Sequence, residues 1–544
     1  MQNSFIKSLS LVSILISHIC FGQTFIHPLK GEKPQLTGNY GEVRPNHFHA
    51  GLDFKTHGTN HLPIYAVADG YVSRIKISSF GYGKVLYITH PNGLVSVYGH
   101  EYGFNDKIKN YAYAAQELAQ SFEIELYPKP NELPVKQGEV IGYTGNTGSS
   151  QGPHLHFELR DEKTEAPLNP LRYLKIEDVV VPKIQRMALY SEDKLEKILS
   201  GIKKTDTLKT SYAIGFGIEC FDYEQTQGNK NNIYKAEIYI DGKLYYRHIL
   251  DSIPFDLARY VNTYADYDLK KQKGITIQKL FKAKNNDLPI YKTINDRGFI
   301  SFTDNAPHAL RIIVYDFYNQ KDELSFNVKT TNTPNKNKES RVGVQDCLLP
   351  YKVSTTDYSI ELPAKSLYED AQLVTAYQNN TLSFAAKDYD IPFQNNCTIT
   401  LKVPTPFLKY GDKLCIADIT NGSKSYVGGA FENGYVKANI KTFGKYKVDV
   451  DTIAPQIKLI TLKKSGVYKN GDIISFRVND IYSGIGVFKL FINGKWHLAE
   501  YEYKTNTIYF TIDEKAPKGK VMLNLQVSDK KNNQTTFQTT LVIQ

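Results

Sequence analysis

Three short segments of the 544-residue chain concentrate histidines and carboxylates that could bind a metal ion or move protons. The most informative segment is 154–160, in which polar and apolar residues alternate: His154, His156, Glu158 and Arg160 with Leu155, Phe157 and Leu159. On a β-strand, alternate residues face opposite sides, so the apolar set is predicted to pack in a core. The two imidazoles then share the other face, about 7 Å apart along the chain. This spacing lets one imidazole bind a metal while its neighbour reaches a substrate.

A second segment offers His49 and Asp53, whose imidazole and carboxylate are ordinary ligands of zinc. On a straight strand the two residues would lie about 13 Å apart, too far to share one ion. Pro45 and Gly51 argue against a helix here. We therefore expect the chain to bend between the two residues, at Gly51. His47 is a rival ligand, which we interpret as structural because its spacing to Asp53 is less typical.

The third segment, 98–100, is predicted to lie where the strand 95–99 ends and presents His100. By itself, a histidine at the end of a strand is more often a hydrogen-bonded surface residue than a catalyst. Further histidines of this region lie near turns, and we interpret them as structural: His57, His61 and His90.

Together the three segments resemble the lysostaphin/LytM family of zinc endopeptidases. Its members carry a His-x-x-x-Asp motif, a later Tyr-x-His and a final His-x-His, and this chain has all three in that order. The stretches 66–72 and 138–148 are also similar to the family, whereas the long segment between His100 and Gly138 departs from it. The resemblance covers about residues 40–172. It implies one zinc ion and two catalytic histidines: His49, Asp53 and His156 as ligands, with His100 and His154 in catalysis.

The resemblance implies an exported metalloendopeptidase that hydrolyses peptide cross-links of bacterial peptidoglycan, with the stem peptides as its partners. Three protein ligands leave a fourth position on zinc for water, whose pKa the ion lowers to about 7. One of His100 and His154 would take the proton of this water and the other would stabilise the oxyanion, but the sequence does not assign the two roles. The alternative is a catalytically silent LytM-like regulator or a wall-binding or adhesion protein. The presence of all five motif residues disfavours it.

The elements around these motifs are predicted to be mostly β. Short alternating segments separated by turn signals fill residues 35–175. The segment 111–122 differs, because its apolar residues recur at helical spacing: Tyr111, Ala114, Ala115, Leu118, Ala119 and Phe122. We expect a peptidase domain at 23–175 with one inserted amphipathic helix. The resemblance implies an antiparallel sheet of the duplicated-hybrid-motif type.

The rest of the chain is predicted to be all β, with a weak internal repeat. Residues 178–184 and 451–457 share the pattern Asp-x-x-x-Pro-x-Ile. Each copy is followed by a hairpin signal, Asp241-Gly242 in one and Asn493-Gly494 in the other, which is typical of a type I′ turn. Each copy then closes with an Ala-Pro pair, a strand and a turn that contains an aspartate, Asp316 or Asp529.

We interpret the two copies as immunoglobulin-like sandwiches. Because the run 331–340 is polar, it is predicted to be a linker. The expected order after the peptidase domain is an immunoglobulin-like sandwich at 176–330, the linker, a β domain of unassigned type at 341–450, and an immunoglobulin-like sandwich at 451–544.

The N-terminus has the features of a secretory signal, in which Lys7 precedes the short, mostly apolar stretch 8–22. We predict cleavage before Gln23, because Ser-His-Ile is a poor lead-in for lipidation of Cys20. No later stretch approaches about 20 apolar residues, so stable membrane insertion is not expected. The protein is therefore predicted to lie in the periplasm or cell envelope, or to be secreted.

The charge balance and the cysteines exclude little. Lys and Arg number 66 against 56 Asp and Glu, a net +10 that is mild for this length. It favours an anionic surface such as a wall polymer and does not indicate nucleic-acid binding. The spacing of the remaining cysteines matches no zinc pattern, and buried thiols explain them at least as well as disulfides: Cys220, Cys347, Cys397 and Cys415.

Overall fold

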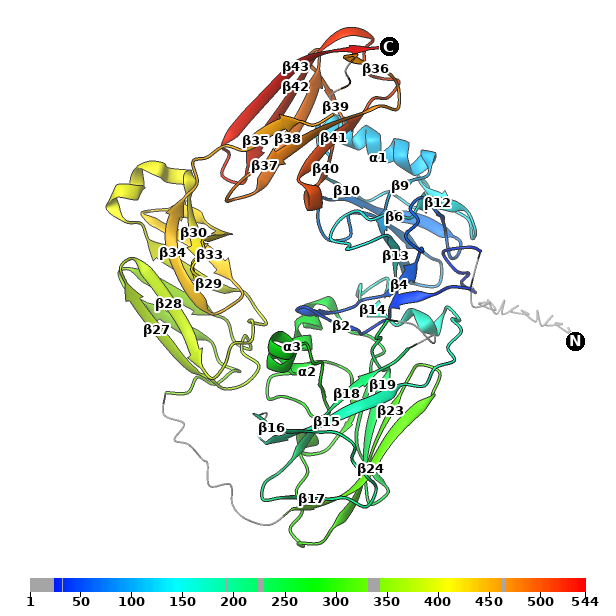
Figure 1. Cartoon of the computed structure of the whole chain (residues 1–544), viewed down its shortest axis with the longest axis vertical. Helices are drawn as coiled ribbons and strands as arrows, with labels where there is room; N and C mark the ends of the chain where they lie inside the picture. The colour runs from blue at the N-terminus through cyan, green and yellow to red at the C-terminus, as the bar shows by residue number, and fades with distance from the viewer. Residues whose placement is uncertain are drawn as a thin grey trace, which may run out of the picture.

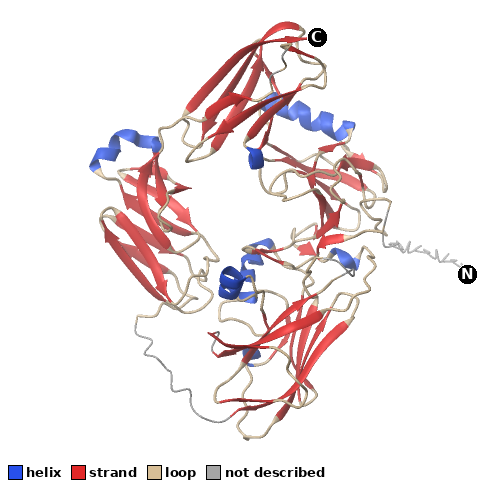
Figure 2. Ribbon diagram, viewed as in Figure 1, coloured by secondary structure: helices blue, strands red, loops and turns tan. Residues whose placement is uncertain are grey.

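A computed structural model gives the fold of this chain. It describes residues 24–31, 33–191, 194–223, 229–330, 343–461, 463 and 465–544. The chain is mainly β, as predicted, and its sheets form four units that follow one another around a ring (Figures 1 and 2). The predicted signal peptide and the predicted linker lie outside the described residues. Within the described ranges, no helix is long and apolar enough to cross a membrane.

The first unit contains a nine-stranded sheet and a three-stranded sheet, in which every strand pair is antiparallel. The path of the large sheet is β1 (Leu36–Gly38), β4 (Leu52–Lys55), β13 (His154–Asp161), β8 (Leu94–Glu101), β7 (Lys84–Thr89), β6 (Gly70–Ile77) and β10 (Ile124–Leu126), with β14 (Pro167–Leu168) beside β13 and β11 (Pro134–Val135) beside β6. The other strands are β5 (Pro63–Tyr65), β12 (Val140–Tyr143) and β9 (Gly103–Phe104) in the small sheet, and the pair β2 (Val43–Arg44) and β3 (His47–Phe48). Because β13 lies between β4 and β8, all three motif segments meet on neighbouring strands.

The alternation along β13 directs its side chains as predicted. Leu155, Phe157 and Leu159 are fully buried in the core of the first unit. The opposite face is also covered, since Glu158 is 0% exposed and Arg160 is 5% exposed. The polar face of β13 is therefore the floor of a covered site rather than a solvated surface.

The inserted helix is α1 (Asp106–Ala119), which begins earlier than predicted. The side chain of Asn105 caps it by accepting a hydrogen bond from the backbone N–H of Ile108. The predicted apolar stripe was partly wrong, because Leu118 is 90% exposed whereas Gln116 is buried. Gln116 tolerates burial because its amide donates to the carbonyl of Phe122. Packing beneath the helix, which spacing does not report, decided which face is buried.

The second unit is a sandwich of a four-stranded and a six-stranded sheet, whose inner faces share one core. At its predicted hairpin, Asp241 and Gly242 have φ angles of 48° and 79°, the left-handed conformation that a type I′ turn requires. Its strands are β15 (Lys183–Ser191), β16 (Lys194–Leu199), β17 (Thr207–Thr210), β18 (Gly215–Phe221), β19 (Lys235–Ile240), β20 (Lys243–Ile249), β21 (Gln278–Lys279), β22 (Tyr291–Ile294), β23 (His308–Tyr315) and β24 (Lys321–Thr330). The helices near it are η1 (Pro170–Arg172), η2 (Phe255–Tyr260), α2 (Val261–Tyr264), α3 (Tyr267–Lys273) and η3 (Asp296–Gly298).

The third unit pairs two five-stranded sheets around one core. Its elements are β25 (Tyr351–Ser354), β26 (Tyr358–Leu362), β27 (Gln372–Gln378), β28 (Thr381–Lys387), β29 (Cys397–Lys402), η4 (Thr405–Lys413), β30 (Leu414–Asp418), β31 (Ser425–Gly428), β32 (Ala430–Glu432), β33 (Tyr435–Ile440) and β34 (Gly444–Val450). Cysteines from the second and third units are buried and unpaired, in keeping with the interpretation as buried thiols: Cys220, Cys347, Cys397 and Cys415.

The fourth unit pairs a four-stranded with a five-stranded sheet, and its hairpin at Asn493 and Gly494 also has positive φ angles, 50° and 82°. Its elements are β35 (Gln456–Leu459), β36 (Val467–Tyr468), β37 (Ile473–Asn479), β38 (Ile485–Ile492), β39 (Lys495–His497), β40 (Glu500–Glu502), η5 (Tyr503–Thr505), β41 (Thr507–Thr511), β42 (Gly519–Asp529) and β43 (Gln534–Ile543). The fourth unit lies beside α1, which closes the ring (Figure 1). Lys515 stacks its ammonium 3.8 Å from the ring of Tyr113 at this contact.

Candidate metal centre

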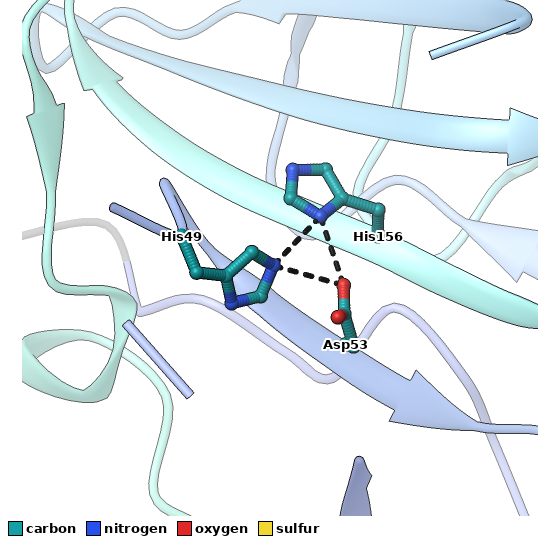
Figure 3. A group of neighbouring side chains, drawn as sticks. All are labelled: His49, Asp53 and His156. Atoms are coloured by element: carbon teal, nitrogen blue, oxygen red, sulfur yellow. Dashed lines mark hydrogen bonds and ion pairs between the residues drawn. The ribbon is translucent and has the colours of Figure 1, made fainter. Parts of the chain in front are cut away.

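Three of the predicted site residues converge on one point of the large sheet (Figure 3). The Nε2 atom of His49 lies 3.0 Å from Oδ1 of Asp53 and 3.1 Å from Nδ1 of His156. The third edge of this triangle, from Nδ1 of His156 to Oδ1 of Asp53, is 2.9 Å. All three side chains are buried, with 5–6% of each residue exposed.

The strand register and one bend bring these residues together. His156 on β13 pairs directly with Asp53 on β4 and with Gly99 on β8. The chain bends at Gly51, as predicted, and a Cβ atom there would lie 2.1 Å from the carbonyl oxygen of Phe157. Only glycine allows β4 to start this close to β13, so the bend that returns His49 toward Asp53 depends on it.

The donor set fits a zinc ion. Bonds of about 2.0–2.2 Å in a tetrahedral arrangement separate ligand atoms by about 3.2–3.6 Å, so the observed triangle needs to expand by only a few tenths of an ångström. The distal nitrogen of each imidazole donates elsewhere: Nδ1 of His49 to the carbonyl of Asn39 (2.7 Å), and Nε2 of His156 to Oε1 of Glu158 (2.8 Å). These bonds fix both tautomers so that two lone pairs point at the shared centre.

The electrostatics of the triad are those of a cation site. Burial disfavours ionisation of Asp53, but its contacts with His49, His154 and His156 hold the pKa of this carboxyl well below its usual value. Burial also opposes a charge on His156, yet hydrogen bonds to Asp53 and Glu158 raise its pKa to about 9. Without a metal, His156 is therefore an imidazolium whose two N–H groups donate to Asp53 and Glu158. Metal binding must displace the proton on Nδ1 of His156, so the affinity for metal falls as the pH falls.

The two other motif histidines lie beside the triad. The ring centroids of His100 and His154 are 4.8 Å apart, and Nε2 of His154 is 3.5 Å from Oδ1 of Asp53. Nδ1 of His100 lies 2.9 Å from the carbonyl of Thr147, and Nδ1 of His154 lies 2.9 Å from the carbonyl of Gly152. Both Nδ1 atoms therefore act as donors, which leaves each Nε2 free to accept a proton.

The position of His100 brings a neutral imidazole beside the triad. Its φ angle is 62°, so the backbone turns sharply where β8 ends and directs the ring toward the triad. Burial, together with the neighbouring His156 and His154, lowers the pKa of His100 to about 3. The ring is therefore neutral at physiological pH.

The histidines interpreted as structural lie outside the triad. His47, the rival ligand, is exposed and bonds the carbonyl of Pro45. His90 is buried between the carbonyl of Asp69 and the hydroxyl of Ser96. His57 lies in a turn and His61 in a loop, both with positive φ angles.

Comparison with known proteins agrees with this arrangement. A model of peptidase family M23 matches residues 47–124 and 128–170, a region that contains every motif residue. Lipoprotein NlpD of Yersinia enterocolitica is 32% identical over 117 residues, which are 22% of this chain and 94% of that protein. The chain belongs to peptidase family M23. This assignment confirms the resemblance to lysostaphin and LytM that the three motifs indicated.

Two further similar proteins each match about a quarter of this chain. The DD-carboxypeptidase/endopeptidase Mpg of Neisseria meningitidis serogroup B (strain MC58) is 34% identical over 124 residues, 23% of this chain and 22% of that protein. The match thus spans about a fifth of that relative's length. A solved catalytic domain of the prophage-encoded M23 protein EnpA from Enterococcus faecalis is 27% identical, covers 26% of this chain and 94% of its own, and has a TM-score of 0.20. A model of the Zu5-like domain matches residues 349–451 in the third unit, whose type the sequence left unassigned.

Glu158 supports the candidate ligand His156, a role that the sequence did not assign. This carboxylate accepts from Nε2 of His156, from Arg160 (2.7 Å) and from the hydroxyl of Tyr82. Burial opposes its ionisation, but Arg160 and His156 lower the pKa of Glu158 to about 2. The signal was its place two residues after His156 on the same strand face.

We expect Glu158→Gln to weaken zinc binding by about 10–100-fold, the usual effect of removing the group that orients a metal-bound histidine. Competition with a chromophoric chelator measures this affinity. Glu125→Gln is the control, because Glu125 also pairs with an arginine, Arg74, but lies far from the triad on β10. Equal affinities for the two variants would remove Glu158 from the metal centre.

The second unit supports His49 from outside the family domain. The side chain of Asn39 donates to the carbonyl of Asn232 (2.8 Å) and accepts from its N–H (3.0 Å), and the carbonyl of Asn39 holds His49. Phe48, next to His49, packs against Tyr264 of α2 with ring centroids 5.2 Å apart. Residues 23–175 alone therefore lack part of the frame of the metal centre.

Asn39→Ala is expected to weaken zinc binding by about tenfold, the lower end of the effect of outer groups. The loop that orients His49 then loses both bonds to Asn232. Asn229→Ala is the matched control, since Asn229 bonds the carbonyl of Thr37 across the same interface without touching His49 or Asn39. The same competition with a chromophoric chelator measures the zinc affinity of both variants. An unchanged affinity in Asn39→Ala would mean that the second unit does not support the site.

The fourth unit contacts the loop that orients the two remaining histidines. The ammonium of Lys504 donates to the carbonyls of Asn146, Gly148 (3.1 Å) and Ser150 (3.4 Å). The same loop supplies the carbonyl of Thr147 to His100, and the hydroxyl of Ser150 lies 3.2 Å from Nδ1 of His154.

We expect Lys504→Met to lower the turnover of a small peptide by about tenfold with full zinc content, because small misplacements of reacting groups are costly. Lys489→Met is the control at the same interface. Its ammonium donates a hydrogen bond to the side chain of Gln120 at 3.4 Å. Steady-state kinetics measure the turnover of both variants. Faster turnover in Lys504→Met would instead indicate that the contact restricts access to the site.

Proposed function

We propose that this protein is an exported zinc metalloendopeptidase that hydrolyses peptide cross-links of bacterial peptidoglycan. The observation that carries the proposal is the buried triangle of His49, Asp53 and His156 with two further histidines beside it. Membership of peptidase family M23 supports the reaction class. The relative named DD-carboxypeptidase/endopeptidase supports the substrate class.

In this proposal His49, Asp53 and His156 hold one zinc ion, and the outer bonds from Asn39 and Glu158 keep both imidazoles in the ligating tautomer. The ion supplies Lewis acidity and lowers the pKa of a water ligand toward neutrality. The remaining work falls to side chains that are not ligands.

His100 and His154 move the protons. Because Nδ1 of each ring donates to a carbonyl, the lone pair of each neutral ring is on Nε2. One of them takes the proton of the attacking water and later delivers it to the leaving amine. The other, protonated at Nε2, donates a hydrogen bond to the oxyanion of the tetrahedral intermediate.

We also propose the domain division from the sequence, with a signal peptide at 1–22 and the peptidase domain at 23–175. The three sandwich units then extend the protein in the periplasm or cell envelope, where its substrate lies. The basic surplus of the whole chain, a net +10, suits an anionic wall polymer.

Digestion of purified peptidoglycan tests this function. We expect the zinc-loaded full chain to convert cross-linked muropeptides into monomers. Mass spectrometry of the released fragments measures the ratio of cross-linked to monomeric muropeptides. The variant His154→Ala, incubated in parallel, should leave the cross-links intact. If the zinc-loaded protein cleaves synthetic peptides and yet leaves the muropeptide profile unchanged, that result would contradict the proposed substrate and indicate a peptidase of another specificity.

A further inference from the structure

Two clusters of aspartates lie outside the metal centre, one in the second unit and one in the fourth. In each cluster, one carboxylate oxygen from each of three residues lies within 4.8 Å of the other two. The members are Asp178, Asp222 and Asp316 in the second unit, and Asp451, Asp480 and Asp529 in the fourth.

The clusters occupy equivalent positions of the internal repeat. The first aspartate, Asp178 or Asp451, precedes the first strand of its unit, β15 or β35. The second follows the strand that pairs with that first strand, β18 or β37. The third stands where β23 or β42 ends, on the strand beside the Asp-Gly or Asn-Gly hairpin. The repeat therefore places three carboxylates at the same end of both sandwiches.

These carboxylates form no ion pairs within the described part of the chain. No ion pair joins any of the six to a lysine, arginine or histidine there, although Asp222 and Asp316 are only 3% and 1% exposed. A third cluster shows how neighbouring carboxylates are usually neutralised, by ion pairs with a lysine. Around Cys347, Asp346 and Asp370 both bind the ammonium of Lys284, at 2.9 and 2.7 Å. At the fourth unit, the charge of Lys531 lies near Asp451 and Asp529 and offsets part of the negative charge. The rest, and the whole charge of the cluster in the second unit, must be compensated from elsewhere.

A neutral oxygen without a hydrogen-bond donor faces the cluster of the second unit. Oδ1 of Asn231 is buried and unpartnered, and the residue is 2% exposed. Asn231 and Asp222 exchange both backbone hydrogen bonds, at 3.1 and 2.9 Å, so their side chains project to the same face. Oδ2 of Asp316 is likewise buried without a partner. Buried oxygens of this kind normally meet a donor or an ion.

The fourth unit repeats this feature with a hydroxyl. Oγ of Ser483 is buried and unpartnered, and the residue is 2% exposed. Its N–H donates to Oδ2 of Asp451 at 3.2 Å, which places Ser483 against the cluster. Oδ2 of Asp480 also lacks a partner. Two independent copies of the fold thus combine three carboxylates with an unpartnered neutral oxygen.

We propose that each of these clusters binds one calcium ion. The donors are oxygens alone, which select a hard cation over zinc. Three carboxylates with a neutral oxygen and space for carbonyl or water ligands suit the six to eight ligands of calcium. Magnesium demands a near-ideal octahedron and keeps several waters, which a mostly buried cluster does not accommodate as well.

Calcium would fasten a junction between units in each case. Asp178 lies in the segment between the first unit and β15, and it lines a cavity with Asp222 that also contacts Asn39 and Asn169 of the first unit. Asn231 directly precedes Asn232, which holds the loop that orients His49. The ion in the second unit would therefore stiffen the frame of the metal centre. Without a cation, burial and the neighbouring carboxylates raise the pKa of Asp222 to about 8, and a proton takes its place.

The two sites should differ in affinity. Lys531 is buried near the cluster of the fourth unit, where its ammonium donates to the carbonyl of Gly429 at 2.9 Å. Its positive charge repels a second cation, and the cluster around Asp222 has no such neighbour among the ion pairs and hydrogen bonds of the described residues. We expect the site of the second unit to bind calcium more tightly.

Equilibrium dialysis of the zinc-loaded full chain against radioactive calcium tests the proposal. We expect two calcium ions per chain, falling to one in Asp222→Asn, to one in Asp480→Asn and to none in the double variant. Asp370→Asn is the matched control and should retain both, because its cluster is already neutralised by Lys284. Zinc content of Asp480→Asn, whose cluster lies in the fourth unit, should stay unchanged, so failure of calcium binding is distinguishable from failure of the zinc site.

Thermal unfolding gives a second measurement that needs no variant. In metal-depleted buffer, calcium at about 10 mM, above the weakest dissociation constants of extracellular calcium modules, should raise the Tm of the zinc-loaded protein. Equal calcium binding by the wild type and the double variant would overturn the proposal, as would a Tm that calcium does not move. An equal response to magnesium at the same concentration would overturn the assignment to calcium.

Discussion

Replacing His156 by alanine is expected to remove most of the zinc from the purified protein, which should otherwise contain about one equivalent. The variant loses one of three ligands and also leaves Asp53 and Glu158 facing each other without the imidazole between them. Two remaining protein ligands do not make a stable zinc site, for which three or four are usual. Metal analysis by mass spectrometry after gel filtration measures the zinc bound per chain.

His47→Ala is the control for that experiment. His47 is the nearest rival in sequence, but the structure places its ring at the surface, bonded to the carbonyl of Pro45. This variant should keep its zinc. Undiminished zinc in His156→Ala, or loss of zinc in His47→Ala, would show that the ion is held by another set of residues.

Alanine at His154 or at His100 is expected to leave the zinc in place and to lower the rate of peptide hydrolysis by roughly 10²–10⁴-fold, the usual range for a group that transfers protons. Neither ring belongs to the triangle of donor atoms, so the metal content should not change. Both rings lie beside the triangle, so the rate should fall. Steady-state kinetics on a soluble peptide, normalised to bound zinc, measures the effect.

His57→Ala is the control for the kinetic experiment, because His57 is exposed and lies in a turn of the same unit. Its rate should match that of the wild type. Near-normal rates in both His154→Ala and His100→Ala would remove these histidines from the mechanism. A loss of zinc along with the rate would reassign them as ligands.

Much of the candidate site was predictable because strand geometry is local. The period of two along 154–160 placed His156 and Glu158 on one face before any partner was known. The bend at Gly51 followed from the length of a straight strand, and the structure contains it. The two hairpins followed from Asp-Gly and Asn-Gly, which adopt positive φ angles at little cost.

The face of α1 was not predictable in the same way. The spacing placed Leu118 on the same stripe as Phe122, but Leu118 is exposed and Phe122 is buried. A short helix with apolar residues on more than one side is oriented by whatever lies beneath it. That partner comes from other parts of the chain and leaves no mark on the helix's own sequence.

The sequence by itself determined the chemistry of this protein: which imidazoles and carboxylates exist, their alternation on strands, and the glycine and turns that let them meet. Only the tertiary structure decided which groups orient them. Asn232 reaches Asn39 across 193 residues, and Lys504 reaches Gly148 across 356. Ligand types are properties of single residues. The hydrogen bonds that fix a tautomer or hold a loop exist only after distant segments have packed, because their energy depends on distances of about 3 Å that no local pattern encodes.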